Sequence, residues 1–387
     1  MTINEIKTVC YVGAGTMGCY NSLAAAISGY DVVLYDVDAN TLAQVPARHG
    51  EMAALLVGGG YCSSDDITDA LQRVTVLADL QEATARAELV SESVFERLDI
   101  KRDIHRRLDQ ICPPNTILTT NSSRLLVSDI ESAVSRGERF AALHSHLGSP
   151  LVDIVGGGRT DPAVIDILRR FVLSTRGAPL VLKKEYPGYV LNAMLGPVLG
   201  AALSLAITDI ASREEVDRAW MIKRGVPMGP FGMMDLFGLN LIFDSWQYRE
   251  GDAHVEQLRP KVLALLKPYI DRGELGIKSG KGFYQYPNPA YQVPGFLDAN
   301  ADVMAVYNTL AVALVANALL IAAHEVAAPR DIDRAWMVGT GQDTGPFNIL
   351  QEMGEQAFRQ ALAGEVAAGR LDAGRAQVAE TWLDRRV

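Results

Sequence analysis

The chain has 387 residues, of which 49% are hydrophobic and 21% charged, and its formal net charge at pH 7 is -10. This length allows two or three domains with large cores. The negative charge argues against nucleic acid as a partner, because phosphate binding needs a basic face. The N-terminus leads directly into a predicted strand without a secretory signal, and the four cysteines show no metal-ligand spacing, so we expect a cytoplasmic protein with reduced thiols and no metal.

The first ~185 residues alternate short apolar runs with helical patterns, which predicts a parallel β-sheet flanked by helices. The predicted strands are residues 8–12, 31–35, 89–91, 116–119, 139–143 and 151–155, and a helix is predicted at 17–28. Residues 41–56 and 65–72 predict a helical hairpin around a turn of three glycines at 58–60.

After Pro187 the sequence changes to long apolar helices. Residues 190–208 and 309–323 carry no charge, but the first contains Asn, Gly and Pro, and the second is too short to cross a bilayer comfortably. We therefore expect buried helices and no membrane partner. Residues 287–295 contain three prolines and a glycine, which predicts a linker.

An internal repeat divides the helical part of the chain. Residues 214–231 (EEVDRAWMIKRGVPMGPF) recur 116 positions later as residues 330–347 (RDIDRAWMVGTGQDTGPF), with nine of the eighteen positions identical. The same alignment pairs Asn192 with Asn308. The repeat predicts an α/β domain at 1–186 followed by two copies of an all-α domain, at 187–290 and 296–387, that bury their apolar faces on each other.

The motif VGAGTMG, residues 12–18, lies between the first predicted strand and the first predicted helix. Gly13 would permit the tight turn, Gly15 the approach of a pyrophosphate, and Gly18 the close packing of helix on strand. The start of the helix would offer N–H groups to the phosphates, so the predicted cofactor-binding residues also include Ala14, Thr16 and Met17.

Asp36 ends the second predicted strand, where an acid can bind the ribose hydroxyls of a dinucleotide. The residues that follow it, VDAN, contain no Arg or Lys that would attract a 2′-phosphate. The pattern therefore favours NAD over NADP, with FAD as the structural alternative.

Eight segments now point to one family: VGAGTMG, ELVSESVFERLDIK (88–101), TTNSSRL (119–125), ERFAALH (138–144), LVDIV (151–155), YPGYVLN (186–192), GVPMGPFGMMDLFGLN (225–240) and GIKSGKGFYQY (276–286). In this order they resemble the L-3-hydroxyacyl-CoA dehydrogenase family over nearly the whole chain. The resemblance implies a Rossmann-like NAD-binding domain followed by helical domains, a role in fatty acid metabolism, and a small-molecule substrate for which an acyl-CoA is one candidate.

The resemblance also implies that His144 is the general acid/base and that a carboxylate orients it. That carboxylate is usually Glu in the family and would here be Asp153. An imidazole suits this chemistry because it titrates near neutral pH, and a carboxylate on its other nitrogen fixes the tautomer. His146, two residues later, could replace His144 or bind a substrate carboxylate. The remaining histidines are expected at the surface or in packing: His49, His105, His254 and His324.

Five further positions receive roles from the resemblance. Ser123 and Asn192 would hydrogen-bond the reacting oxygen, since neutral donors polarise it without taking its proton. Glu96 falls near the nicotinamide and the substrate, and Lys101 and Asn121 are assigned to the cofactor site.

The chain departs from the family in two places. The loop HSHLGSPLVD lacks the family's Asn-Pro and is shorter, and the hairpin lacks the lysines that face the CoA phosphates, although Arg48 and Arg73 remain. A small hydroxy acid or an aldehyde therefore stays open as substrate, as does an NAD-binding protein without turnover. A monomer with an intrachain pseudo-dimer and a homodimer are both open.

Overall fold

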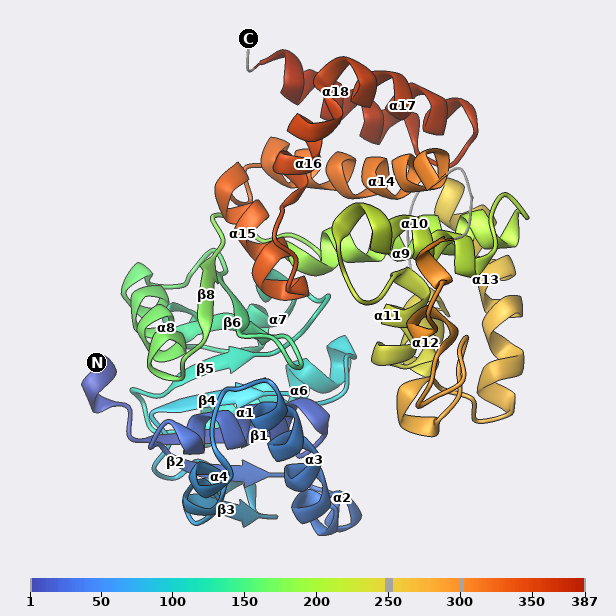
Figure 1. The fold of residues 1–387 in the computed structure, drawn as a ribbon. Coiled ribbons are helices and arrows are strands. Elements are labelled where there is room, and N and C mark those ends of the chain that lie inside the picture. The colour runs from blue at the N-terminus through green and yellow to red at the C-terminus, as the bar shows by residue number, and fades with distance from the viewer. Residues whose placement is uncertain (1, 248–252, 299–302, 386–387) are drawn as a thin grey trace. The chain divides into compact units, whose positions relative to one another are not determined.

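The computed structural model describes residues 2–247, 253–298 and 303–385 (Figure 1). Its contacts divide the chain into two compact units. Unit 1 comprises residues 1–190 together with 325–327 and 338–341, and unit 2 comprises residues 191–324, 328–337 and 342–387. The N-terminal α/β region and the helical region are therefore separately packed bodies.

Unit 1 is built on an eight-stranded sheet with the strand order β3-β2-β1-β4-β5-β6-β7-β8 (Figure 1). The strands are β1 (Thr8–Val12), β2 (Asp31–Tyr35), β3 (Val74–Leu77), β4 (Leu89–Glu92), β5 (Ile117–Thr120), β6 (Phe140–Ser145), β7 (Leu151–Gly156) and β8 (Ala178–Val181). Six of them correspond to predicted strands. The two that were not predicted, β3 and β8, are the edge strands of the sheet, and each is four residues long and only partly buried.

The prediction of a wholly parallel sheet was wrong at one pair. β6 and β7 are antiparallel, whereas the other paired strands run parallel. Only residues 146–150 connect them, and five residues can close a hairpin but cannot make the crossover that parallel neighbours need. This hairpin sets residues of β6 directly opposite residues of β7.

Helices flank the sheet of unit 1. They are α1 (Thr16–Ile27), α2 (Ala39–Ala43), α3 (Val45–Gly58), α4 (Ser64–Leu71), α5 (Leu80–Thr84), α6 (Leu98–Ile111), α7 (Val127–Ile130) and α8 (Pro162–Ser174). The predicted hairpin is present as α3 and α4, both packed against α1. Its first helix begins later than predicted because Pro46 favours a helix start, which leaves α2 as a separate short helix.

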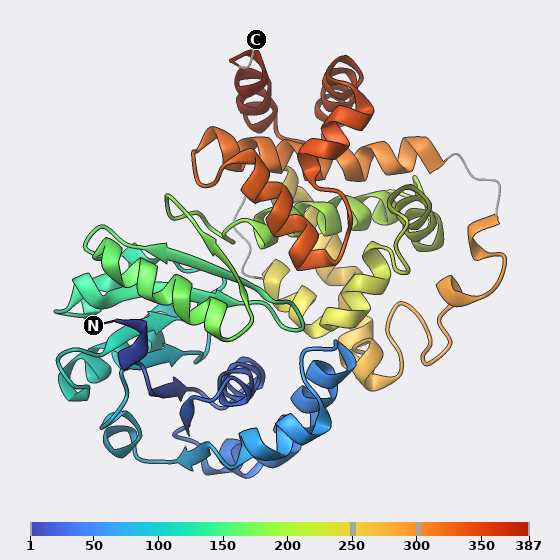
Figure 2. The same cartoon turned by 60° about the vertical axis from the view of Figure 1, so that its left-hand side comes forward.

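Unit 2 is all-helical and contains both copies of the repeat. The first copy supplies α9 (Leu191–Ile207), α10 (Arg213–Arg224), α11 (Pro230–Phe237), α12 (Leu239–Gln247) and α13 (Ala253–Asp271); the second supplies α14 (Val303–Ala323), α15 (Pro329–Thr340), α16 (Pro346–Met353), α17 (Glu355–Ala367) and α18 (Ala373–Asp384). The equivalent helices α9 and α14 lie side by side (Figures 1 and 2). The duplicated Trp220 and Trp336 meet edge to face, with ring centroids 6.3 Å apart. The copies therefore pair within one chain, as predicted.

The repeated residues form the same helix cap in both copies. The Asp217 carboxylate accepts hydrogen bonds from the N–H groups of Phe231, at 2.7 Å, and Gly232, at 3.0 Å, at the start of α11. The Asp333 carboxylate accepts one from Phe347, at 2.8 Å, at the start of α16. Helix N-termini carry unpaired N–H groups, so the acid stabilises each start; Asp217 is buried and Asp333 is partly buried.

One helix of the described residues, α14, is long and apolar enough to cross a membrane. In this chain 72% of its apolar window is buried, and it packs against α9, α10 and α16–α18. The other uncharged stretch forms α9, which is also largely buried. The predicted linker at 287–295 contains the buried Tyr291, whose ring lies edge-on to Tyr284 with centroids 5.0 Å apart.

Candidate active site

The glycine-rich turn between β1 and α1 shows which of its three glycines the fold itself requires. Gly13 has a φ of 106°, and a Cβ there would lie 2.7 Å from the carbonyl oxygen of Ser93. A Cβ on Gly18 would lie 1.8 Å from the carbonyl oxygen of Gly13. At Gly15, in contrast, a Cβ would meet nothing within 4 Å among the described residues. The protein itself requires the outer two glycines, and the space over Gly15 is open to a phosphate group.

Asp36 lies beside this turn. Its carboxylate accepts hydrogen bonds from the N–H of Ala14, at 2.8 Å, and of Asp38, at 3.0 Å. Arg48, on α3, donates to the carbonyl of Ala14 at 2.6 Å and to the side chain of Gln44 at 2.8 Å. The sequence placed Arg48 on the hairpin but did not predict this contact with the turn. Arg48 and Asp36 thus bind the carbonyl and the N–H of the same residue of the turn, Ala14.

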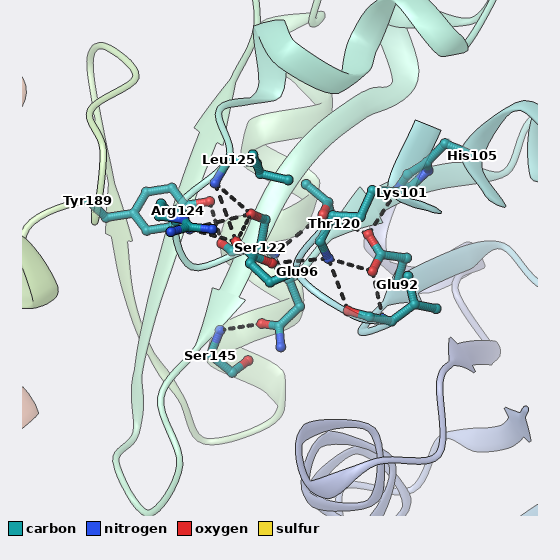
Figure 3. Close-up of polar contacts among 12 residues, drawn as sticks. Glu92, Glu96, Lys101, His105, Thr120, Ser122, Arg124, Leu125, Ser145 and Tyr189 are labelled. Atoms are coloured by element: carbon teal, nitrogen blue, oxygen red, sulfur yellow. Dashed lines mark hydrogen bonds and ion pairs between the residues drawn. The ribbon is translucent and has the colours of Figure 1, made fainter. Parts of the chain in front are cut away.

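The ends of β5 and β6 are joined by Asn121. This residue is 9% exposed, and its side-chain oxygen accepts a hydrogen bond from the N–H of Ser145 at 2.8 Å (Figure 3). Its own N–H donates to the carbonyl of Glu92, at the end of β4, at 2.8 Å. Asn121 thus holds three strand ends together next to the predicted cofactor site.

His144 and Asp153 are partners across the antiparallel pair β6–β7. His144 Nδ1 lies 3.0 Å from Asp153 Oδ2, and the two side chains are 6% and 0% exposed. Asp153 thus contacts the edge of the His144 ring, and one face of the ring stacks on Tyr189, with centroids 4.8 Å apart and planes at 22°. The Tyr189 hydroxyl donates to the carbonyl of Ser122 at 2.8 Å. The imidazole is therefore fixed in orientation from two sides.

His146 also binds Asp153. Its Nε2 lies 2.9 Å from the same oxygen, Oδ2, and its ring meets that of His144 edge-on with centroids 4.5 Å apart. Side chains two positions apart along a strand point to the same face, so the HSH sequence presents both imidazoles to one carboxylate. His146 does not replace His144 on the acid but shares it.

The two pKa values favour a neutral base next to an anion. Burial lowers the pKa of His144, and the neighbouring His146 lowers it further, against the opposing effect of Asp153. Burial alone would raise the pKa of Asp153, but the hydrogen bonds from the two imidazoles outweigh it and the pKa falls below its usual range. A neutral imidazole that donates from Nδ1 keeps a lone pair on Nε2, and can accept a proton there.

Glu96 is bound to the loop that follows β5. One carboxylate oxygen accepts hydrogen bonds from the Ser122 hydroxyl, at 2.5 Å, and from the N–H of Arg124, at 2.9 Å (Figure 3). Ser122 is buried, whereas the adjacent Ser123 is exposed. The structure thus brings Glu96 to Ser122 rather than to Ser123, and leaves the Ser123 side chain at the surface of unit 1.

Glu96 also contacts a cluster of buried charged residues through Lys101. Lys101 is 1% exposed, and its Nζ lies 2.6 Å from Glu92 and 3.4 Å from Glu96 (Figure 3). His105 Nε2 and the Thr120 hydroxyl also contact Glu92, at 3.2 and 2.8 Å. The Lys101 ammonium is therefore committed to carboxylates. His105, expected at the surface or in packing, is buried and contacts the buried Glu92 carboxylate.

Sequence reasoning missed four residues of this region. Tyr189, Ser122, Glu92 and Arg48 all contact predicted site residues or the glycine-rich turn. Tyr189 and Ser122 lie inside the quoted segments YPGYVLN and TTNSSRL, so their place in those motifs was the available signal. Asn192 lies in the first turn of α9, in unit 2, and is half-buried.

Two family models together match most of the chain. The model described as "3-hydroxyacyl-CoA dehydrogenase, NAD binding domain" matches residues 8–186, and its "C-terminal domain" matches residues 188–286 and again 306–386. Hydroxyacyl-coenzyme A dehydrogenase, mitochondrial, of Rattus norvegicus is 30% identical over 73% of this chain and 91% of its own length. The chain belongs to the 3-hydroxyacyl-CoA dehydrogenase family. It is accordingly an NAD-dependent dehydrogenase with a Rossmann-like NAD-binding domain, and the second C-terminal match supports the duplication.

Other members and neighbours of the 3-hydroxyacyl-CoA dehydrogenase family extend the comparison. The probable 3-hydroxybutyryl-CoA dehydrogenase of Bacillus subtilis is 29% identical over 73% of this chain and 98% of its own length. A solved diketoreductase is 35% identical over 73% of this chain and 99% of its own, with a TM-score of 0.66. A 3-hydroxybutyryl-CoA dehydrogenase from Escherichia coli K12 covers 98% of both chains with a TM-score of 0.77, and at 22% identity it shows that the whole fold, second helical copy included, is shared.

Proposed function

We propose that the enzyme oxidises the hydroxyl of a 3-hydroxyacyl compound to the 3-oxo product, with His144 as the general base. The observation that carries this proposal is the bond between His144 Nδ1 and Asp153 Oδ2. It leaves the second ring nitrogen, Nε2, to take the proton of the substrate hydroxyl. NAD, when bound, accepts the hydride that leaves the hydroxyl-bearing carbon. The residues of the glycine-rich turn fit this cofactor, since Gly15 is open and Asp36 is adjacent.

Asp153 supports the base in two ways. Its carboxylate accepts the Nδ1–H and so selects the tautomer, and it stabilises the imidazolium that forms once the proton has been transferred. The stacked Tyr189 prevents the ring from turning away, and burial raises the pKa of Tyr189, which keeps its phenol uncharged. A general base of this kind contributes ~10²–10⁴ to the rate.

The reacting oxygen needs donors that hold it without taking its proton. Ser123 is the serine available for this, because the Ser122 hydroxyl is bound to Glu96. The resemblance assigns Asn192 the same task, and this assignment stays a prediction. Neutral donors aimed at an oxygen that gains negative charge are worth a few kcal/mol each.

A CoA thioester is the first candidate for the substrate, because the relatives named above act on hydroxyacyl-CoA or hydroxybutyryl-CoA. A second candidate is a small hydroxy-carbonyl compound without CoA. Two observations favour it. The hairpin with its flanking Arg73, residues 45–73, carries four acidic residues against two arginines, and both arginines have partners: Arg48 is bound to the glycine-rich turn and Arg73 lies 3.8 Å from Asp31. Phosphate groups avoid such a surface. The similar diketoreductase is named for its action on dicarbonyl compounds.

The test compares matched substrates in both directions. NADH formation would be followed with 3-hydroxybutyryl-CoA, free 3-hydroxybutyrate and an aldehyde, and NADH oxidation with acetoacetyl-CoA and a free β-diketone. Turnover confined to the CoA esters supports the first candidate, and a higher kcat/KM on the free compounds supports the second. NAD binding without turnover of any of them would contradict the proposal and leave a silent NAD-binding protein.

A further inference from the structure

Two histidines, His144 and His146, form hydrogen bonds to the same oxygen of Asp153. Both imidazoles donate to Asp153 Oδ2, from distances of 3.0 and 2.9 Å. The other oxygen, Oδ1, is buried and has no hydrogen-bond partner within the described part of the chain. A carboxylate offers about four acceptor positions on its two oxygens, so this arrangement is strongly one-sided.

This one-sided sharing affects the base. When His144 takes a proton, the carboxylate must stabilise the resulting positive charge, and the Oδ2 atom that does so is already bound by His146. A second N–H on the same oxygen reduces the negative charge that the first can use. Any positive charge on His146 would also repel one on His144, since their ring centroids are 4.5 Å apart.

We propose that His146 is a positioning residue that shares Asp153 with His144 and so keeps the His144 imidazole neutral and ready to accept a proton. This inference rests on the proposed role of His144 as general base. The inference also assigns a role to the HSHLGSP loop, because the short turn from β6 to β7 places His146 within hydrogen-bond distance of Asp153.

The other titratable groups that face His144 within unit 1 do not have this effect. Tyr189 stacks on the ring, but its hydroxyl is bound to the carbonyl of Ser122. Glu96 acts in the opposite direction, because its negative charge favours protonation of His144. Asp153 also favours it. Among these groups only His146 opposes protonation.

Two substitutions at one position separate the hydrogen bond from the ring. In His146→Leu the second donor to Asp153 is lost, whereas in His146→Gln an amide N–H can replace Nε2–H. We expect the acid limb of the kcat/KM profile for alcohol oxidation to move about one pH unit toward alkaline pH in His146→Leu. In His146→Gln it should stay close to that of the wild type. The inference is overturned if the Leu profile coincides with that of the wild type, or if the Gln profile moves as far as the Leu profile.

A second measurement needs no turnover. In protein labelled at its six histidines, the ring signals are titrated by NMR, and His144 is assigned by the signal lost in His144→Ala. His144 should titrate at higher pH in His146→Leu than in the wild type, with circular dichroism confirming that the variant is folded. If His144 titrates at the same pH in His146→Leu as in the wild type, the inference is wrong, even if His144→Ala is inactive. An active His144→Ala contradicts the proposed function, while the NMR titration still decides the coupling.

Discussion

Replacement of Glu92 tests how far the buried ion cluster stabilises unit 1. The Glu92 carboxylate is fully buried and accepts hydrogen bonds from four groups: the Lys101 ammonium, the His105 ring, the Thr120 hydroxyl and the N–H of Val94. Glu92→Gln keeps the shape but removes the charge. It leaves a lysine that is 1% exposed without its closest counter-charge.

Two independent estimates give a similar loss of unfolding free energy for Glu92→Gln. Burial alone would raise the pKa of Glu92, but Lys101 and His105 lower it from 4.5 to about 2. A difference of that size between the folded and unfolded states is worth about 3 kcal/mol of stability at neutral pH. Removal of one partner from a buried ion pair typically costs ~3–5 kcal/mol. Because the folded pKa is the lower one, this stability is complete above pH 4.5 and is lost as the pH falls from there toward about 2.

The assay is urea unfolding of the wild type and of Glu92→Gln across this pH range. We expect Glu92→Gln to lower the free energy of unfolding by about 3 kcal/mol at pH 7. The difference between the two proteins should become smaller below pH 4.5. Asp103→Asn, which breaks an exposed pair on α6 with Arg106, is the matched control and should cost less than ~1 kcal/mol. Adding Lys101→Met to Glu92→Gln should recover part of the loss, because no unpaired charge remains. A Glu92→Gln loss below ~1 kcal/mol, or one that is independent of pH, would refute the reasoning.

Three further predictions concern the cofactor, the base and the assembly. His144→Ala should lower kcat by ~10²–10⁴ and leave the Kd for NAD unchanged by calorimetry; a full-rate variant contradicts its role as base. Asp36→Ala should weaken NAD binding about ten- to a hundredfold in a fluorescence titration, and NADP binding less, because the repulsion of the 2′-phosphate is removed; equal losses would argue against Asp36 at the ribose. Since the duplicated helices pair within one chain, light scattering should give a monomer of 41.9 kDa, and a stable dimer would contradict that expectation.

The parts of the fold that the sequence predicted are those fixed by local requirements. Gly13 and Gly18 are needed because a Cβ at Gly18 would collide with the backbone of the turn, and one at Gly13 with the backbone of Ser93, just after β4. Such contacts follow from a short motif. The direction of β7 was missed although five connecting residues exclude a crossover, so loop length held information that the strand pattern did not.

The site was only partly predictable. That His144 and His146 share a face follows from their spacing, but that both reach Asp153 depends on the register of the hairpin. Lys101 and His105 are four residues apart, a spacing that puts them on one face of α6. Both residues contact Glu92 at the end of β4, and no local sequence pattern specifies that partner. Long-range pairs of this kind account for most of what the sequence did not show.

The duplicated cap shows which requirement the repeat preserves. Asp217 and Asp333 each bind the first turn of the following helix, and at Gly229 and Gly345 a Cβ would lie within 2.4 and 2.3 Å of the respective acid. The identical Asp and GPF positions are therefore explained by helix capping alone. Asp217 has in addition the Tyr284 hydroxyl, at 3.0 Å, from the segment GIKSGKGFYQY, which the second copy lacks in sequence. Identity between the copies is thus evidence for a shared way of folding and is not by itself evidence for a catalytic role.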